Sequence, residues 1–456
     1  EETVTSLGAG YRYAPVWSPD STKLVFIDSD SKLHLFEVAG RALRTIDRLP
    51  WMNHGGLTGF TASWSGDSRW LAYARMLDNR QSAIMLYDTA SGAQHQLTAG
   101  FVNAAQPVFD PEGKYLYYLA DAAFEPSYSD FEPTWIYANA TRLMAAPLRR
   151  DVPSLLAPRN DVEKAGSEAD EKGDGDEATK KRKKNGAKDG NEDEDEAAPE
   201  KPAPVLIDLD GLEGRAVPLP PKAGNFGRLA AVKGKVLYQR LPRTGSGDEA
   251  RPLVFWDLEK REEKTILDSV DGFTVSADGA KLLVPSGGSH AIIEVAPSQK
   301  MEKSLATAKM EMTVVPREEW RQLFTEAWRL ERDYFYDPGM HGVDWQGMRE
   351  RYGALLDDVI TRWDLNFLIG ELIAELNSSH SYRGGGDVEE GAERGVGLLG
   401  VNWELPEGAY RIAKVITAAP WDSEVRSPLA ESGVQGGQGD WVLAVNGQTI
   451  DTAKDP

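Results

Sequence analysis

The stretch PVWSPDS at residues 15–21, followed by the apolar run KLVF at residues 23–26, is the first copy of a repeated pattern. The pattern returns as SWSGDS and WLAY within residues 63–73, and as PVFDPEG and YLYY within residues 107–118. The central aromatic residues are 47 and 45 residues apart, at Trp17, Trp64 and Phe109. A period in the forties, built from short apolar runs and Pro, Asp or Gly turns, is typical of β-propeller blades.

The repeat continues later in the chain. FTVSADG and KLLV, within residues 273–284, form a fourth copy, and LAAVKGKVLY at residues 229–238 forms a weaker one. We expect a further, outer strand after each turn, at residues 33–38, 83–88, 253–257 and 292–295. These copies predict about five blades. A β-sandwich with coincidental spacing is the alternative, but turn residues recur at the same place in each unit, which favours the propeller.

The length of 456 residues is too great for one core, so two to four domains are expected. Residues 2–7 resemble residues 95–98, which close a blade, and we therefore expect a fragment that opens on the last strand of a blade. The sequence contains no run of 18 apolar residues, so no membrane span is predicted, and no signal peptide is visible. The sequence contains no cysteine, which excludes disulfides, thiolate catalysis and zinc–thiolate sites.

The formal net charge of −21 argues against a nucleic-acid partner, because phosphate binding requires a basic surface. Part of the acidity is local: the 41 residues from 161 to 201 include 15 acidic and 9 basic side chains. The basic run KKRKK at residues 180–184 is interpreted as part of a solvated loop rather than as a nuclear address or nucleic-acid patch. We expect a disordered insertion at about residues 155–203, because such a composition buries too little apolar surface to offset chain entropy.

After about residue 310 the apolar period changes from two to 3.6, which indicates helices. Pro316 opens the first apolar stripe, residues 345–359 carry the second, and residues 365–376 carry the third. Thr361 and Asp364 have the spacing of a capping box at the start of the third helix. The sequence therefore predicts a propeller over residues 1–309 and a small helical bundle over residues 310–386.

From residue 395 the period returns to two, which predicts strands at residues 395–401 and 410–416, a short helix at 427–434, and a strand, turn and strand at 439–450. GDWVLAVNG at residues 439–447 closely resembles a PDZ domain. We expect this domain over residues 387–456, with its last helix and strand missing. The resemblance places the loop that holds a peptide's terminal carboxylate at Leu398, Leu399, Gly400 and Val401.

No complete catalytic motif is present: the sequence lacks a Gly-x-Ser-x-Gly elbow, a His-Glu-x-x-His pair, a Walker loop and an EF-hand loop. Of the six histidines, His341 and the four before it are interpreted as structural. His380 differs in setting, because it follows a helix end, stands between hydroxyl residues and lies at a domain junction. On these residues alone, a catalytic role and a surface role both remain open for His380.

The order of propeller, helical bundle and PDZ domain resembles the tricorn proteases, which are related to the carboxyl-terminal processing peptidases. The resemblance is carried by FYDPGMHGVDW at residues 335–345 and ELNSSHSY at residues 375–382. It implies a seven-bladed propeller, of which about five blades are present, and a serine peptidase that degrades oligopeptides. In that family the Ser–His pair after the bundle supplies the general base and an orienting hydroxyl, which implies these roles for His380 and Ser379.

The family's nucleophilic serine and a further acidic residue come from a domain after the PDZ domain, and another propeller lies upstream, so both are expected outside this chain. The implied reaction is acyl transfer: His380, as a neutral imidazole, takes the proton of a serine hydroxyl and returns it to the leaving amine. The resemblance also implies that the propeller filters entering peptides, that no cofactor or metal is needed, and that the protein is a homo-oligomer, as a hexamer. It favours a cytoplasmic location, with the periplasm as the alternative.

Two other functions fit parts of the pattern. A non-catalytic propeller–PDZ scaffold would bind peptides and would tolerate the loss of His380. A hydrolase similar to the prolyl oligopeptidases would also carry a propeller, but it would require a Gly-x-Ser-x-Gly elbow, and the helical and PDZ segments argue against it.

We predict that limited proteolysis cuts residues 161–201 before any other part of the chain, because this segment has almost no large apolar side chain to bury. Mass spectrometry of the first fragments identifies the cut, and deletion of the segment is expected to change the melting temperature by only a few degrees. Amides protected from hydrogen exchange across these residues would contradict the prediction.

Overall fold

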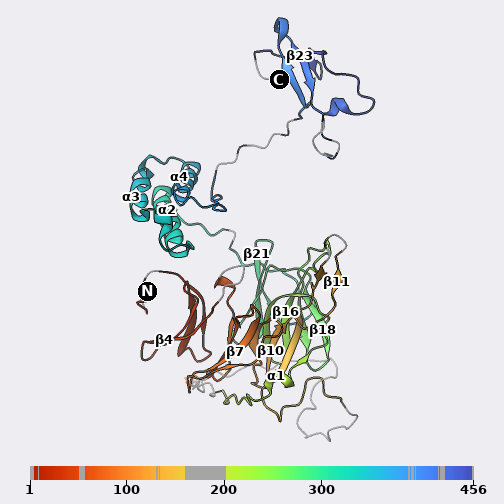
Figure 1. Ribbon diagram of the computed structural model, residues 1–456. Helices are drawn as coiled ribbons and strands as arrows, with labels where there is room; N and C mark the ends of the chain where they lie inside the picture. Colours follow the sequence, from red (N-terminus) through yellow and green to blue (C-terminus); the bar gives the residue numbers. More distant parts are fainter. Residues whose placement is uncertain are drawn as a thin grey trace, which may run out of the picture. The chain divides into compact units, whose positions relative to one another are not determined.

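The computed structural model describes residues 5–8, 10–50, 57–129, 132, 134–159, 202–307, 309–388, 391, 395, 397–417, 419, 421 and 427–453. By its internal contacts the chain divides into two compact units, Glu1–Gln346 and Gly347–Pro456. Figure 1 shows the ribbon of the chain. Most of the insertion predicted to be disordered at about residues 155–203 lies outside the described residues. Its ends, residues 155–159 and 202–203, are described, and Leu155 and Leu156 pack against a buried cluster. The first half of the strand expected at residues 2–7 also lies outside the described residues, and its described half, residues 5–7, is not a strand.

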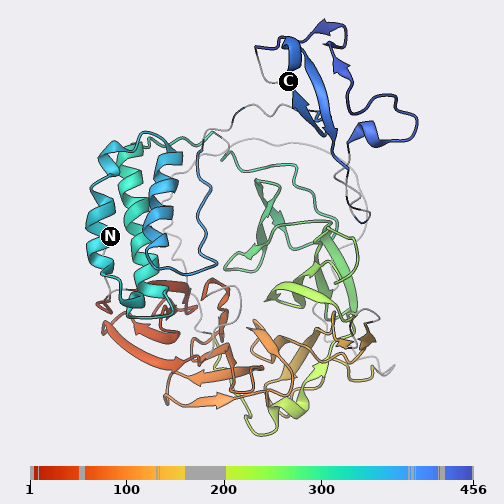
Figure 2. The ribbon, with the colours of Figure 1, turned by 45° about the horizontal axis from the view of Figure 1, so that its top comes forward.

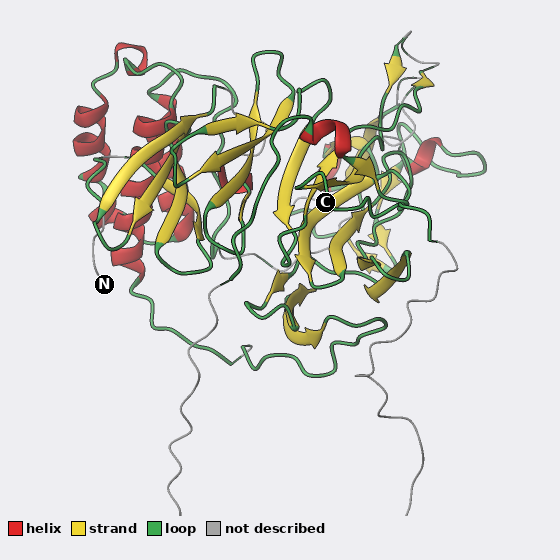
Figure 3. Cartoon of the chain, turned by 90° about the horizontal axis from the view of Figure 1, so that it is seen from below, coloured by secondary structure: helices red, strands yellow, loops and turns green. Residues whose placement is uncertain are grey.

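The described part of the first unit contains five antiparallel sheets of three or four strands, which follow one another in sequence order around an arc, and one two-stranded sheet (Figure 2). Strands make up most of its regular structure (Figure 3). The first sheet comprises β1 (Arg12–Trp17), β2 (Lys23–Asp28), β3 (Lys32–Glu37) and β4 (Ala42–Arg48), and the second comprises β5 (Ala62–Trp64), β6 (Trp70–Met76), β7 (Ser82–Asp88) and β8 (Gln94–Gln96).

The third sheet has the order β14-β13-β10-β9, so its strands are not all consecutive in the chain, unlike those of the first two sheets. It comprises β9 (Ala104–Phe109), β10 (Tyr115–Ala120), β13 (Arg142–Pro147) and β14 (Val217–Pro218). A separate hairpin, β11 (Ser127–Tyr128) and β12 (Trp135–Ile136), is inserted between β10 and β13, and helix α1 (Leu212–Arg215) precedes β14. The fourth sheet comprises β15 (Asn225–Val232), β16 (Lys235–Leu241), β17 (Leu253–Asp257) and β18 (Glu262–Leu267). The fifth sheet comprises β19 (Thr274–Val275), β20 (Lys281–Ser286) and β21 (Ser289–Glu294).

These sheets confirm the repeat predicted from the sequence. The central aromatic residue of each of the first three copies is the last residue of the sheet's first strand, at Trp17, Trp64 and Phe109. The strands expected to be outermost proved to be the third strands of the first, second and fourth sheets. The fourth strands β4, β8 and β18 lie outside them. The sequence indicated β8, since residues 95–98 were expected to close a blade, but it did not reveal β4 and β18, which are largely polar and exposed.

Apolar side chains fill the spaces between consecutive sheets. Four clusters of buried residues lie at the four junctions, and each joins side chains of both neighbours, as in Leu35 with Leu71, Leu86 with Leu116, Tyr117 with Tyr238, and Phe255 with Leu282. Hydrogen bonds also join first strands: Phe109 donates its backbone N–H to Ser63 Oγ at 3.1 Å, and Leu229 donates to Gln106 Oε1 at 2.9 Å. Neighbouring sheets therefore bury one another, as propeller blades require.

One turn structure recurs in the first, second and fifth sheets. Ser18 Oγ donates to Asp20 Oδ1 at 2.6 Å and accepts the backbone N–H of Lys23 at 2.9 Å. The same pair of bonds is made by Ser65 with Asp67 and by Ser276 with Asp278. This recurring geometry explains why Ser and Asp return at the same spacing: their side chains bond to backbone groups that a tight turn would otherwise leave without a partner.

The helical region consists of α2 (Pro316–Tyr334), η2 (Met340–Gly342), α3 (Trp345–Gly353), η3 (Leu356–Asp358) and α4 (Arg362–Ala374). In the first unit, Trp328 and Trp345 each donate an indole N–H to the other's backbone carbonyl, at 2.8 and 3.0 Å. Tyr11 at the start of the first sheet donates to Glu326 Oε2 at 2.9 Å, and its ring lies 5.6 Å from that of Tyr334. Helix α2 is therefore attached to the first sheet by side-chain contacts.

The PDZ segment contains β22 (Val401–Glu404), η4 (Pro406–Gly408), β23 (Tyr410–Val415), η5 (Pro428–Ala430), β24 (Trp441–Val442), β25 (Ala444–Val445) and β26 (Gln448–Thr449). Three predicted boundaries were wrong. The second helix ends at Gly353 and continues only as η3. The first PDZ strand begins at Val401 rather than at residue 395, because Gly400 has a φ of +62°, outside the β region. The helix expected at residues 427–434 is only the turn η5, which Pro428 opens.

We predict that Asp20 stabilises the first sheet in a pH-dependent manner. Partial burial raises the pKa of Asp20, but hydrogen bonds from Ser18 and Thr22 lower it to about 2, below its ordinary 3.8. Because the folded-state pKa is the lower one, the stabilisation is present above about pH 4 and is lost as the pH falls through about 2. Asp20→Asn is therefore expected to lower the urea midpoint at about pH 7, with a difference from wild type that shrinks on acidification.

The measurement is urea unfolding, followed by tryptophan fluorescence, of both proteins between neutral and acid pH. Asp30→Asn is a control on a carboxylate that lies outside the turn network, and a smaller effect is expected there. A constant difference between wild type and Asp20→Asn at all pH values would contradict a role for the ionised carboxylate.

Candidate functional site

Helix α4 positions the segment that contains His380. The predicted capping box is present: Asp364 N donates to Thr361 Oγ1 at 3.2 Å, and Thr361 N donates to Asp364 Oδ2 at 2.9 Å. Leu365 and Leu376, at the two ends of the apolar stripe, are fully buried. After the helix, Asn377 and His380 adopt φ values of +48° and +59°, in the left-handed region. The backbone therefore turns sharply twice within four residues.

The chain then returns along α4. Asn366 Nδ2 donates to the carbonyl of Gly385 at 3.1 Å, and Arg362 Nη1 lies 3.4 Å from Asp387 Oδ1. A Cβ on Gly370, in the middle of α4, would lie 2.7 Å from Arg383 Nε, so glycine lets the returning segment approach the helix. His380 therefore lies at the turn between helix α4 and the returning segment, and the contacts above hold that segment against the helix.

His380 is exposed at this turn, and its ring contacts Tyr382. Tyr382 Oη lies 3.3 Å from His380 Nδ1, and the two rings meet edge to face at 6.2 Å. Ser379 is exposed, and its carbonyl accepts a bond from Ser378 Oγ at 3.4 Å. Among the described contacts, the ring of His380 is thus paired with Tyr382 and not with the expected Ser379. Tyr382 belongs to the motif ELNSSHSY, but no role was predicted for it from the sequence.

This pairing has a chemical consequence. If Nδ1 carries the proton and donates to Tyr382 Oη, the lone pair of Nε2 is available to accept a proton from a nucleophile. A general-base histidine is oriented by a hydrogen-bond acceptor on Nδ1–H, and the hydroxyl oxygen of Tyr382 can serve as that acceptor. The turn therefore presents an accessible imidazole with one nitrogen held and the other available.

The other histidines with described contacts have local structural partners. His341 lies in η2, where its ring contacts Phe335 edge to face at 4.9 Å and is hydrogen bonded to Tyr336. His34 is buried in the first sheet, with Nε2 at 2.7 Å from Asp28 Oδ2. These contacts agree with the structural roles assigned to both from the sequence.

A second candidate site is a cavity of about 960 Å³ in the PDZ segment. Its walls are largely apolar and include Leu398, Leu399, Trp403, Ile412, Trp441 and Val445. Two of the four residues assigned to the carboxylate loop, Leu398 and Leu399, thus line the cavity. Ser427, which is buried, donates its hydroxyl to the carbonyl of Leu399 at 2.6 Å and fixes this loop. Sequence reasoning missed Ser427 because its partner is 28 residues away.

In the described part of the chain, no group of three or more His, Asp or Glu side chains is arranged to hold a metal ion. None of the described helices combines the length and apolar character needed to cross a membrane.

Propeller-type sheets followed by a helical region and a PDZ segment define a multidomain protein in which helical and PDZ modules follow a β-propeller. Three family models match in that order: the tricorn protease second beta propeller domain over residues 1–296, the C1 domain over residues 316–374, and the PDZ domain over residues 397–456. The chain belongs to the tricorn protease family.

Individual relatives give the same result. Tricorn protease homolog 1 of Streptomyces coelicolor is 29% identical over 96% of this chain, and the tricorn protease of Thermoplasma volcanium is 25% identical over 96%. The crystal structure of the tricorn protease matches 98% of the chain with a TM-score of 0.72 and 20% identity, which shows a shared fold. The chain spans about 40% of the length of the two relatives and 41% of that structure.

We predict that replacement of Gly400 destabilises the loop that precedes β22. A Cβ at this position would lie 3.0 Å from both Cα and Cβ of Ser427, in addition to the cost of its positive φ. Gly408 is the matched control, since it also has a positive φ, of +78°, but its Cβ would meet no atom within 4 Å. Gly408→Ala is expected to cost about 1 kcal/mol of PDZ stability, and Gly400→Ala at least about 1 kcal/mol more.

Hydrogen exchange of the amides in β22 and β23 measures both effects. Equal destabilisation by the two substitutions would show that the contact with Ser427 does not matter.

Proposed function

We propose that this chain is part of a serine peptidase that hydrolyses oligopeptides. The observation that carries the proposal is His380, which stands exposed at the turn after α4 within ELNSSHSY, in a chain that belongs to the tricorn protease family. The relatives named as proteases support peptide-bond hydrolysis as the reaction.

In the proposed mechanism His380 is the general base. Its Nε2 removes the proton of a serine hydroxyl as that oxygen attacks the peptide carbonyl, and the imidazolium then protonates the leaving amine. Ser379 is proposed as the hydroxyl that orients the imidazole through Nδ1. Tyr382 is bonded to Nδ1 in the structure, so closure of the site would exchange one hydroxyl for the other.

The nucleophilic serine is proposed to come from a part of the protein outside residues 1–456. Two observations support this: the sequence has no Gly-x-Ser-x-Gly elbow, and the chain spans only about 40% of its relatives. In this proposal residues 1–456 bring the base and the peptide-guiding domains, and another segment brings the nucleophile and the remaining charge-relay residue.

The PDZ segment is proposed to bind the carboxyl end of a peptide at Leu398, Leu399, Gly400 and Val401. The adjacent apolar cavity of about 960 Å³, and the attachment of this loop to Ser427, support the assignment. The domain boundaries at residues 309 and 386, a homo-oligomeric and specifically hexameric assembly, and a cytoplasmic location remain proposals that rest on family resemblance.

We predict that His380→Ala in the longer protein lowers kcat for a fluorogenic peptide by at least about 10²–10⁴-fold, the usual contribution of a general base. The variant is expected to fold normally, because the side chain is exposed and buries little apolar surface. Ser379→Ala is expected to lower kcat less, since water can replace part of an orienting hydroxyl.

His341→Ala is the control, and it is expected to lower the melting temperature more than kcat because its ring packs in an aromatic turn. Tyr382→Phe tests the alternative partner of Nδ1. Residues 1–456 alone are expected to show no turnover. Wild-type kcat/KM in His380→Ala would reject the peptidase assignment for this residue and favour the peptide-binding scaffold.

A further inference from the structure

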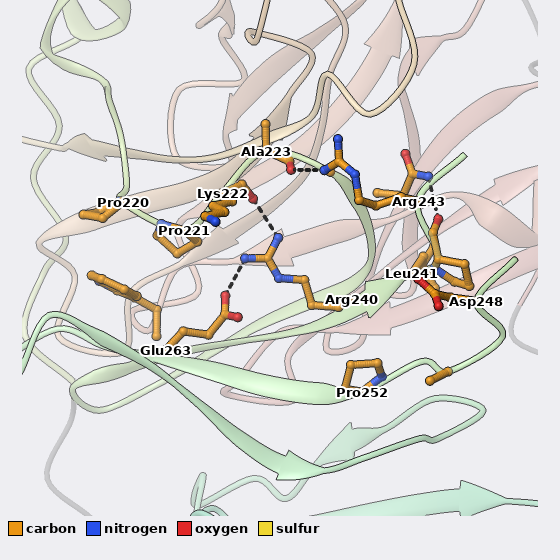
Figure 4. Close-up of a pocket in the computed structure, with 15 residues that line it drawn as sticks. Pro220, Pro221, Lys222, Ala223, Arg240, Leu241, Arg243, Asp248, Pro252 and Glu263 are labelled. Carbon is orange, nitrogen blue, oxygen red and sulfur yellow. Dashed lines mark hydrogen bonds and ion pairs between the residues drawn. The ribbon is translucent and has the colours of Figure 1, made fainter. Parts of the chain in front are cut away.

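A pocket of about 620 Å³ lies on the fourth propeller sheet (Figure 4). One wall is the segment from Pro220 to Asn225, and another is the end of β16 with the residues that follow it, from Arg240 to Arg243. Pro252 and Trp256 add apolar surface. Nothing in the proposed peptidase mechanism uses this pocket.

One of the three cationic side chains that line the pocket, Arg240, is already bonded to other residues of the protein. Arg240 donates to the carbonyl of Lys222 at 2.7 Å and to Glu263 Oε2 at 2.5 Å (Figure 4). Its guanidinium also lies over the ring of Phe226, at 4.7 Å from the centroid. Arg240 is therefore a structural residue whose charge is neutralised by Glu263.

Two other cations, Arg243 and Lys222, are exposed at the rim. Arg243 Nη1 donates to the carbonyl of Ala223 at 2.9 Å, which holds the guanidinium at the pocket while the side chain stays exposed. Only one further acid, Asp248, lines the pocket besides Glu263. The described lining thus carries an excess positive charge on a chain whose net charge is −21, which makes it a local site for a carboxylate.

An aromatic surface borders the same rim. The hairpin β11–β12 and its flanks expose Phe124, Tyr128, Trp135 and Tyr137, by 80%, 54%, 56% and 57%. The Tyr128 and Trp135 rings pair edge to face at 5.5 Å. Asn139 accepts the backbone N–H of Thr244 at 2.9 Å, which joins the base of this hairpin to the pocket's rim loop. A cluster of exposed aromatic side chains beside a pocket is typical of a binding surface for peptides.

The kind of carboxylate follows from the donors available. A peptide's terminal carboxylate is usually held by successive backbone N–H groups. Here the lining contains four prolines, which have no N–H, and the N–H of Gly224 is already donated to the carbonyl of Thr141 at 3.1 Å. The pocket offers side-chain cations instead, which suit the carboxylate of an Asp or Glu side chain.

We propose that this pocket and the adjacent aromatic hairpin bind a peptide segment that contains an acidic side chain next to aromatic or aliphatic residues. Arg243 and Lys222 bind the carboxylate, the prolines and Trp256 contact its aliphatic stem, and the hairpin binds the neighbouring apolar side chains. The proposal rests on the proposed function only in taking a peptide as the ligand, and a binding assay tests it without turnover.

The probes are three fluorescein-labelled hexapeptides, measured by fluorescence anisotropy with residues 1–456. The first is Gly-Phe-Glu-Ala-Phe-Gly as the C-terminal amide, the second has Gln in place of Glu, and the third is the Gln peptide with a free C-terminus. The Glu peptide is expected to bind about tenfold more tightly than both Gln peptides, the size of one charge-assisted hydrogen bond, and added salt is expected to weaken it.

Arg243→Ala and Trp135→Ala are each expected to weaken binding of the Glu peptide about tenfold. Lys222→Ala is a second rim variant that leaves the backbone carbonyl used by Arg240 in place. Matched controls are Arg228→Ala, an exposed cation on β15 outside the pocket, and Phe101→Ala, a 91% exposed aromatic elsewhere. Circular dichroism confirms that each variant is folded.

Tight binding of the free-acid Gln peptide would overturn the choice of a side-chain carboxylate. Equal binding of all three peptides, or unchanged binding by folded Arg243→Ala and Lys222→Ala, would overturn the pocket itself. Neither result depends on His380, so failure of this proposal would leave the proposed peptidase function untouched.

Discussion

The propeller depends on apolar packing between consecutive sheets. Every residue of β10 is buried, although alternate side chains of a strand point to opposite faces of its sheet. The two faces of the third sheet accordingly contribute to two different clusters, Leu116 and Tyr118 toward the second sheet, and Tyr117 toward the fourth. No single sheet is stable with both of these faces in water, so each requires its neighbours.

This constraint explains where the chain can vary. The inner strands and the Ser–Asp turns are fixed by packing and hydrogen bonds, whereas connections at the edge of a sheet can lengthen without disturbing a junction. The third sheet shows this, since the β11–β12 hairpin is inserted between β10 and β13, which still pair over six residues from Tyr115 to Ala120. The two cations proposed to bind a peptide carboxylate, Lys222 and Arg243, lie on such connections, as expected when a rigid scaffold carries variable loops.

How much of the fold the sequence could predict depended on the range of the interactions. Repeated turns, the capping box at Thr361 and the start of α2 at Pro316 are local, and all were predicted correctly. The polar fourth strands β4 and β18 were missed because β-pairing, rather than apolar periodicity, places them. The contact of Ser427 with Leu399 and the pocket around Arg243 depend on residues far apart in sequence, and no local pattern could indicate them.

The same distinction applies to His380. The sequence identified the residue from its motif, but the contact with Tyr382 depends on the left-handed conformation of Asn377 and His380. This conformation is uncommon for residues other than glycine, although Asn and His adopt it more often than most. Such a conformation persists only where surrounding structure holds it. Here Leu376 is buried at one end of the turn, and at the other end Arg362 and Asn366 bind the returning segment. The interactions that fix the imidazole therefore lie in helix α4 and its return segment, and a substitution there would displace His380 without touching it.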